Sequence, residues 1–355
     1  MNICFVNSTR KWGGVKTWTL DAAQGLAASG HQVLVIGRFG PFIDKAQTQG
    51  LEALGQSFGP DFNPLLIQRL MHIFRRHKID VVVVNVGKDM RSAGVAAKLL
   101  GIPVVHRVGL AGDMLNTWKV RLLHQWVRPR LLVPCNQIKN GLMQALPYLL
   151  AEEITVIPTG KIPLPTPPSV VHQPLRLIST SQLNADKGHE DVLRALATLA
   201  EQGVNFTYHV VGTGGIEGRL QALSRALLLE DRVVWHGFRT DVRLLLRQAD
   251  IFLLPSYREG LPNALLEAMA EGLVCVARDV GGVSEVWPPS EPLLSPDAQG
   301  PDIADALRRL ALLDEASLLA RKRLFWKQAV ANSLDVMAHR LERFFLDTRR
   351  HVHGA

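Results

Sequence analysis

Short apolar runs alternate with amphipathic stretches along most of this chain. The runs at 81–84, which is four valines, and at 251–256 predict strands buried on both faces, as in parallel sheets. Stretches with apolar residues every three or four positions, as at 15–28 and 190–202, predict the helices between them. A regular alternation of strands and helices predicts an α/β fold with parallel sheets.

The pattern runs through two similar halves. Strands are expected at 2–7, 32–37, 81–84, 102–105, 131–134, 154–158, 175–179, 207–211, 233–235, 251–256 and 274–277. Helices are expected at 15–28, 65–78, 91–100, 190–202, 216–227, 241–248, 262–272 and through the tail from 302 to 349. The fold class is therefore two doubly wound, Rossmann-like domains.

A proline-rich stretch at 161–174 separates the halves and predicts a stiff, extended linker. The expected domains are residues 1–165 and 166–330, followed by a C-terminal helix at 331–355 that packs back on the body. A length of 355 residues with 47% hydrophobic residues is sufficient for two cores.

The cysteine spacing, the apolar runs and the charge distribution indicate where the protein is located and what kind of partner it binds. The start lacks a signal-peptide pattern, no apolar run is long enough for a membrane span, and the three cysteines have no metal spacing, so we expect a cytoplasmic protein. Residues 1–165 hold 19 Lys and Arg against 9 Asp and Glu, whereas residues 166–355 hold 21 against 23. The positive excess predicts that the first domain meets an acidic partner or an anionic surface. The sequence lacks a motif of interleaved aromatic and basic residues that would support nucleic-acid binding, so we do not expect a nucleic-acid partner.

The stretch 118–130 carries tryptophans, leucines and basic residues at helical spacing. We expect its apolar face to pack in the core. The basic face, which includes Lys119, Arg121, Arg128 and Arg130, is left open between an ordinary solvated surface, a membrane surface and an acidic acceptor.

The most informative stretch is 257–272, which follows a predicted strand. Gly260 allows close backbone approach, and Pro262 suits the first position of a helix whose N-terminus attracts phosphate. Glu259 and Glu267 supply carboxylates that accept hydrogen bonds from sugar or ribose hydroxyls. This combination suits the binding of a nucleotide sugar. The same residues also occur in ordinary turns and at the ends of helices that bind no ligand.

The Gly13-Gly14 pair and His106, in the first half of the chain, each allow either a ligand-binding role or an ordinary structural role. Gly13 and Gly14 precede a helix without the dinucleotide fingerprint, so they are either a tight turn or a backbone approach to phosphate or sugar. His106 follows a buried strand at the sheet edge where α/β proteins bind ligands, and it is either a ligand contact or an edge histidine.

A set of strings in the second half resembles one family. These are Val211-Gly212-Thr213-Gly214, Gly237-Phe238-Arg239-Thr240-Asp241, Ala249-Asp250, Pro255-Ser256, Glu259 to Glu267 with seven residues between, and Gly281-Gly282-Val283-Ser284-Glu285. In this order they resemble the retaining GT-B glycosyltransferases of family 4, the glycosyl transferases of group 1.

The resemblance implies roles for individual residues. Glu267 would hold the donor ribose, Glu259 would contact the donor sugar, and Lys187 would neutralise the departing diphosphate. The implied catalytic residues are Glu259, Lys187 and His106. Of these, His106 would face the sugar from the first domain. Further donor contacts are implied at Gly13, Gly14, Gln182, Gly212, Phe238, Gly260, Leu261, Asn263 and Ala264.

One position departs from the family pattern. The family has Gly-Arg-Leu before the lysine, where this chain has Ser181-Gln182-Leu183. Gln182 donates hydrogen bonds but carries no charge. The departure predicts either weaker activity or compensation by another cation, such as Arg107 or Arg239.

The expected function is transfer of a sugar from a nucleotide-diphosphate donor to a glycan or glycolipid acceptor in bacterial surface-polysaccharide or lipopolysaccharide biosynthesis. The reaction is expected in a cleft between the domains, without a metal or other cofactor. Two alternatives remain, a non-catalytic nucleotide-sugar-binding protein and a GT-B nucleotide-sugar epimerase. Peripheral contact with the inner face of an anionic membrane also stays open.

Overall fold

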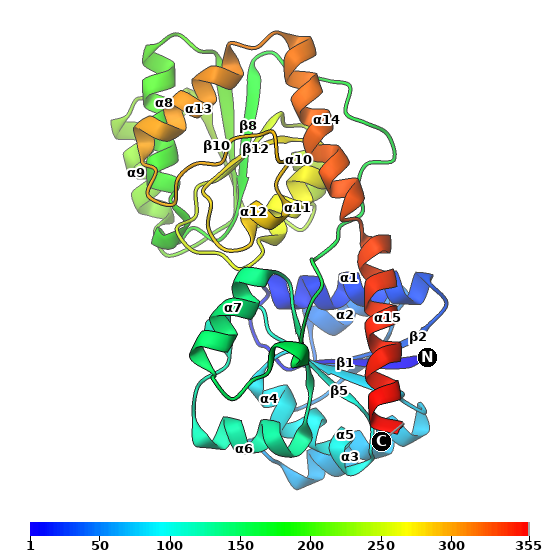
Figure 1. Cartoon of the computed structure of the whole chain (residues 1–355). Coiled ribbons are helices and arrows are strands. Elements are labelled where there is room, and N and C mark those ends of the chain that lie inside the picture. The colour runs from blue at the N-terminus through cyan, green and yellow to red at the C-terminus, as the bar shows by residue number, and fades with distance from the viewer. Residues whose placement is uncertain (354–355) are drawn as a thin grey trace. The chain divides into compact units, whose positions relative to one another are not determined.

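The chain folds into two compact units. The computed structural model describes residues 1–353, and their side chains as far as Arg350. The first unit comprises Met1–Gly160 together with the segment from Leu334, and the second comprises Lys161–Ser333 (Figure 1). The sequence placed these divisions at 165/166 and 330/331. Of the expected C-terminal segment, residues 354 and 355 lie outside the described part.

The first unit is built on a seven-stranded sheet of parallel strands in the order β3-β2-β1-β4-β5-β6-β7. Its strands are β1 (Asn2–Asn7), β2 (Gln32–Gly37), β3 (Glu52–Gly55), β4 (Val81–Val84), β5 (Val104–Arg107), β6 (Arg130–Val133) and β7 (Ile154–Val156). The order reverses between β1 and β4, which is the doubly wound arrangement predicted from the sequence.

Helices cover both faces of this sheet (Figure 1). They are α1 (Gly14–Ala28), α2 (Pro41–Thr48), α3 (Pro64–Arg76), α4 (Gly87–Asp89), the π-helix η1 (Met90–Gly94), α5 (Val95–Leu99), the 3₁₀ turns η2 (Ala111–Asp113) and η3 (Ala151–Glu153), α6 (Trp118–Val127), α7 (Asn136–Ala145) and α15 (Leu334–His353). Helix α15 returns from the end of the chain to complete the first core, where Leu341 and Phe345 are fully buried.

The second unit has a five-stranded parallel sheet in the order β10-β9-β8-β11-β12. Its strands are β8 (Leu175–Thr180), β9 (Phe206–Val211), β10 (Val233–Gly237), β11 (Ile251–Leu254) and β12 (Val274–Ala277). Its helices are η4 (Ala185–Lys187), α8 (His189–Glu201), α9 (Glu217–Ala226), η5 (Glu230–Arg232), α10 (Val242–Leu246), α11 (Asn263–Ala270), α12 (Val283–Val286), α13 (Gly300–Ala311) and α14 (Glu315–Ala331). This sheet reverses its order between β8 and β11.

Apart from the short 3₁₀ turns, four elements lie where the hydrophobic pattern predicted none, namely α2, β3, α7 and α12. Each is short and buries few residues, so its apolar signal is weak; α7, for example, buries only Ile138 and Leu142. The helix predicted at 91–100 begins earlier, at Gly87, because the carboxylate of Asp89 accepts a hydrogen bond from the Val86 backbone N–H at 3.1 Å and caps the start.

The proline-rich segment is fastened to the second unit. The Leu164 backbone N–H donates to the Ala270 carbonyl at 2.8 Å, and the Trp326 indole N–H donates to the Leu164 carbonyl at 3.0 Å. These bonds hold the segment against α11 and α14, so it is part of the packed unit.

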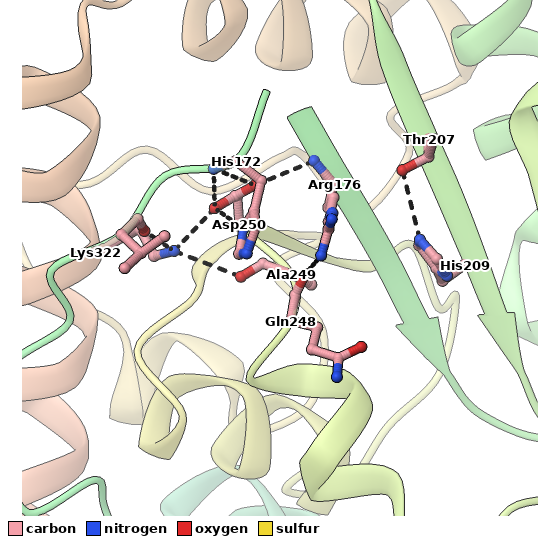
Figure 2. Close-up of polar contacts among 9 residues, drawn as sticks. His172, Arg176, Thr207, His209, Gln248, Ala249, Asp250 and Lys322 are labelled. Carbon is pink, nitrogen blue, oxygen red and sulfur yellow. Dashed lines mark hydrogen bonds and ion pairs between the residues drawn. The ribbon is translucent and has the colours of Figure 1, made fainter. Parts of the chain in front are cut away.

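A buried polar cluster around Asp250 holds the C-terminal end of the proline-rich segment, near His172, by hydrogen bonds (Figure 2). The fully buried carboxylate of Asp250 accepts hydrogen bonds from the backbone N–H groups of His172 and Arg176 and lies 3.0 Å from the Nζ of Lys322 on α14. Burial lowers the pKa of Lys322, and the charge of Asp250 opposes that shift. Asp250 immediately precedes β11, one of the strands at the switch point, so the Ala249-Asp250 string has a structural role here.

Helix α6 packs only in part as expected. Val127 and His124 are buried, but Trp118, Leu122 and Trp126 are 68%, 55% and 46% exposed. These three residues are spaced four apart and therefore form one stripe of the helix. The expected core packing of the apolar face is confirmed for Leu123 and Val127, which pack in the core of the first unit. It is wrong for the stripe of Trp118, Leu122 and Trp126, which is exposed.

Along the described residues, no helix combines the length and the apolar composition that crossing a membrane requires.

Candidate active site

The loops that follow β8 and β11 form the candidate site of the second unit. These strands are neighbours at the point where the sheet order reverses, and open parallel sheets bind ligands beyond the carboxyl ends of such strands. The loop after β8 carries Gln182 and Lys187, and the loop after β11 carries Glu259 and Gly260. The fold therefore gathers residues that lie about seventy positions apart in the sequence.

Two of the implied catalytic residues are paired directly. The Nζ of Lys187 lies 2.7 Å from the Oε1 of Glu259. The Glu259 side chain is only 14% exposed, so this pair is shielded more than an ordinary surface ion pair. The pair joins the two loops across the switch point and fixes the position of the lysine charge.

The second carboxylate also has a cationic partner. Glu267, on α11, lies 3.0 Å from the Nζ of Lys161, whose side chain is 9% exposed. Lys161 was treated in the sequence only as part of the proline-rich linker. No spacing or pattern in the sequence signals this contact, because it depends on how the linker packs against α11.

Close backbone packing fixes the Glu259 loop. A Cβ at Gly281 would lie 2.3 Å from the carbonyl oxygen of Gly260, and the φ angle of +62° also favours glycine there. The Gly282 N–H donates to the same carbonyl at 2.6 Å. The Gly281-Gly282 string is therefore needed for contact between the loops that follow β11 and β12.

The loop after β8 is held in the same way. Gly212 has a φ of +140°, and a Cβ there would meet the Ser181 carbonyl oxygen at 1.8 Å. Gln182, next to Ser181, is exposed and accepts a hydrogen bond from the Asn184 side-chain amide at 3.2 Å. Phe238, which the resemblance places near the nucleobase, is 67% exposed.

Helix α11 begins one residue later than predicted. Pro262 has φ −73° and ψ 116° and is the N-cap, so Asn263 is the first helical residue. The Oδ1 of Asn263 and the Oγ of Ser256 are buried and have no hydrogen-bond partner among the described residues. Such buried polar atoms are uncommon, and here they occur where the N-terminus of α11 presents free backbone N–H groups.

A buried arginine that sequence reasoning missed supports this corner. The Arg278 guanidinium donates to the Pro255 carbonyl at the start of the Glu259 loop and to the Asp191 carboxylate at 2.7 Å. It also lies 4.0 Å from the ring centroid of Tyr257. Arg278 follows β12 without any recognisable motif, so its role could only be found in the structure.

In the first unit, Gly13 and Gly14 lie exposed at the N-terminus of the fifteen-residue helix α1, beyond the end of β1. Asp89 accepts hydrogen bonds from the backbone N–H groups of Ser8 and Asn85 and so joins the ends of β1 and β4. Burial raises the pKa of Asp89 to about 6.

His106 is buried at the end of β5, and its Nδ1 lies 3.2 Å from the Nε2 of His124 on α6. Burial and the neighbouring His124 lower the pKa of His106 to about 3, and burial lowers that of His124 to about 4. Both rings are therefore neutral at pH 7. Whether His106 contacts a sugar stays a prediction.

The two cations considered as substitutes for the missing arginine differ. Arg239 forms a two-pronged ion pair with Asp241 at 2.8 and 2.6 Å, so its charge is already balanced. Arg107 is buried with its guanidinium 4.5 Å from the ring centroid of Trp18, and burial lowers its pKa to about 10. Arg107 remains a cation at neutral pH.

Among the side chains described, up to residue 350, no three His, Cys, Asp or Glu gather as a metal site. The absence of a metal requirement stays a prediction.

Two family models match consecutive parts of the chain. The model described as Glycosyltransferase Family 4 matches residues 12–160, and the model described as Glycosyl transferases group 1 matches residues 167–329. The chain belongs to the family 4 glycosyltransferases. The second match contains Lys187, Glu259 and Glu267, and the first contains Gly13, Gly14 and His106.

Curated relatives and solved structures agree with the assignment. The chain is 32% identical to the putative colanic acid biosynthesis glycosyltransferase WcaL of Escherichia coli over 59% of its own length and 55% of that protein. It is 26% identical to an Escherichia coli UDP-Gal:α-D-GlcNAc-diphosphoundecaprenol α-1,3-galactosyltransferase over 60% and 61% of the two chains. The chain thus spans little more than half of these relatives.

The fold is that of a known GT-B structure. Anabaena HepE in complex with UDP superposes with a TM-score of 0.80 at 19% identity, over 98% of this chain and all of that one. At this identity the likeness supports the fold and not the substrate.

Proposed function

We propose that this chain is a retaining glycosyltransferase that moves a sugar from a nucleotide-diphosphate donor to a glycan or glycolipid acceptor. The observation that carries the proposal is the Lys187–Glu259 pair at the switch point of the second sheet, beside the start of α11 and close in sequence to Glu267. Family membership supports a nucleotide donor. The name of WcaL supports a role in polysaccharide biosynthesis.

The donor diphosphate gains negative charge as the sugar bond breaks. An ammonium group has three N–H donors, so one bond to Glu259 leaves others on Lys187 for diphosphate oxygens. Free N–H groups at the start of α11 add a second source of positive potential. Because both groups are positioned beforehand, they stabilise the departing charge without reorganisation, and the proposal needs no metal.

Glu267 would bind the ribose in a similar way. A carboxylate has about four lone-pair sites on its two oxygens. Lys161 occupies one side of Glu267 at 3.0 Å, which leaves acceptor sites for the two ribose hydroxyls. Lys161 is thus a positioning residue that orients the carboxylate, while Glu267 makes the contact.

The proposed acceptor is lipid-linked and reaches the enzyme at an anionic membrane. One relative is named for an acceptor on diphosphoundecaprenol, which is a lipid. In the first unit, the stripe of Trp118, Leu122 and Trp126 on α6 is exposed, and Lys119 and Arg128 flank it. Tryptophans with adjacent cations suit the interface of an anionic bilayer.

The net charge of the first unit favours the same partner. It holds 22 Lys and Arg against 12 Asp and Glu, whereas the second unit holds 18 against 20. Each cation close to an anionic membrane contributes about 1 kcal/mol of attraction.

A non-catalytic nucleotide-sugar-binding protein is the second candidate, because Gln182 replaces the family's arginine with an uncharged group. Slow hydrolysis of a bound donor, measured with and without added lipid-linked acceptor, separates the two. Binding with no donor cleavage under either condition would favour the non-catalytic protein.

The central experiment measures thermal unfolding with UDP-, GDP- and ADP-sugars. A ligand that binds only the folded protein raises the unfolding temperature. We expect one nucleotide class to do so for the wild type and to have a smaller effect on Glu267→Gln. If none of the three raises the unfolding temperature, the donor proposal is wrong.

A further inference from the structure

The first unit contains an open hollow of about 560 Å³ at the edge of its sheet. Arg130 on β6, Thr155 on β7 and one face of α15 line it. Strand β7 is the outermost strand of the sheet, three places from β4 at the switch point, or roughly 14 Å at the usual strand spacing. The hollow, here called the arginine hollow, is therefore separate from the Gly13-Gly14 loop.

Helix α15 contributes a stripe of charged residues to the arginine hollow. Arg340, Arg343, Asp347 and Arg350 are spaced three, four and three apart, which puts them on one face of the helix. The three arginines are exposed, and none of them makes an ion pair with any residue up to Arg350. Arg340 and Arg343 are like charges three apart on the helix, which is mildly destabilising in the free protein.

Arg130, at the inner side of the hollow, is packed against other side chains. The guanidinium of Arg130 lies 5.8 Å from the ring centroid of Phe344 and 3.7 Å from the Asp347 carboxylate. Its side chain is 24% exposed, and its Nε is buried with no hydrogen-bond partner among the described residues. An N–H donor in that state is uncommon in folded proteins. The hollow thus combines one partly buried guanidinium with three exposed ones.

We propose that the arginine hollow is a binding site for a phosphate-bearing anion with two or more charges. Guanidinium groups donate paired N–H bonds whose geometry matches phosphate oxygens. Four arginines against one aspartate leave a local charge of about +3, which a diphosphate balances better than a single carboxylate does. The volume lies within the range of about 300–1,000 Å³ usual for small-ligand sites.

Two sources supply this chemistry, a free phosphate compound and the head group of an anionic lipid. Both present phosphate oxygens to the same guanidinium groups. The first experiment uses inorganic pyrophosphate, and the second uses vesicles of phosphatidylglycerol or phosphatidylcholine.

Pyrophosphate binding is located by hydrogen exchange with mass spectrometry at constant ionic strength. We expect protection in peptides that cover 154–157 and 340–350, measured separately from any protection at 255–265 in the candidate active site. The double variant Arg340→Gln/Arg343→Gln should need at least tenfold more pyrophosphate for the same protection. Both residues are exposed, so the variant should fold normally.

The matched control is Arg75→Gln/Arg76→Gln, which removes the same charge from exposed positions of α3 in the same unit. It should bind pyrophosphate as the wild type does. The absence of protection at both hollow peptides in the wild type, or equal weakening by the two double variants, would overturn the site.

The vesicle experiment distinguishes the sources. If the hollow variant also loses affinity for phosphatidylglycerol vesicles relative to the control, the bound phosphate belongs to a lipid head group. Unchanged vesicle affinity, together with weaker pyrophosphate binding, assigns the hollow to a free phosphate compound. Both results support the site.

Discussion

The Nζ of Lys161 lies 3.0 Å from a carboxylate oxygen of Glu267, so the residue expected to hold the ribose is itself held by a lysine from the proline-rich segment. The Lys187–Glu259 pair repeats this arrangement at the other end of the motif. Each carboxylate of the pair implied by the family resemblance is therefore oriented by a lysine from a distant part of the second unit.

Glu267→Gln should weaken nucleotide binding without unfolding the protein. The amide keeps the shape of the side chain but loses the charge that strengthens hydrogen bonds to ribose hydroxyls. Such bonds contribute about 1.5–3 kcal/mol each, so we expect at least a tenfold rise in the nucleotide Kd by calorimetry. Glu230→Gln, at an exposed position of the second unit outside the family strings, is the control. An unchanged Kd in Glu267→Gln would contradict the ribose assignment.

Lys187→Ala should lower kcat more than it raises KM. The lysine is proposed to stabilise charge that appears only as the sugar bond breaks, and interactions confined to the transition state are lost from kcat. Steady-state kinetics with the donor identified by the stabilisation screen measure both constants. A rise in KM alone would mean that Lys187 binds the ground state and the transition state equally. Lys98→Ala, at a helix in the first unit, controls for loss of charge.

The His106–His124 pair should make the first unit less stable in acid. Burial lowers the pKa of both rings in the folded protein, to about 3 and about 4, so the unfolded chain binds more protons as the pH falls below about 6.5. The free energy of unfolding should fall by up to about 1.4 kcal/mol per pH unit for each histidine between pH 6 and 4. Asp89, whose pKa burial raises to about 6, partly offsets this slope.

Urea unfolding at several pH values measures that slope. His124→Asn should flatten it between pH 6 and 4, whereas replacement of the exposed His72 should not. An identical slope in both variants would show that the buried pair does not control the acid sensitivity.

Trp118→Gln/Trp126→Gln should weaken binding to phosphatidylglycerol vesicles severalfold at low salt. The change removes the two largest exposed apolar groups of α6 and leaves its cations in place. Phe39→Gln/Leu65→Gln, at exposed apolar positions of the same unit, is the matched control. Vesicle flotation should show the loss only for the α6 variant, and binding should fall with salt. Equal wild-type binding to neutral vesicles would remove the membrane proposal.

The sequence was most informative where backbone chemistry and hydrophobic pattern coincide. The apolar run at 251–256 predicted a strand, and the positions of Gly260, Pro262 and Gly272 predicted a loop followed by a helix. The structure has all three elements. Parallel-sheet topology then explains why the loops after β8 and β11 meet. The helix start was wrong by one residue because Pro262 also fits the N-cap.

Contacts made by packing could not be predicted. Lys161 and Arg278 reach Glu267 and the Glu259 loop through tertiary structure that leaves no spacing in the sequence. Helix α6 shows a second limit. Its periodicity predicted an amphipathic helix correctly, but periodicity does not say which stripe is covered, and Trp118 and Trp126 are exposed.

The return of α15 to the first unit has a consequence for folding during synthesis. Residues 161–333 form a continuous unit that is complete as soon as it leaves the ribosome, whereas the first unit must wait for Leu341, Phe344 and Phe345. We therefore expect the later-synthesised unit to fold first and the N-terminal sheet to keep one apolar face uncovered until α15 emerges. A truncated chain that ends at residue 333 and has left the ribosome should show a protease-resistant second unit and a protease-sensitive first unit.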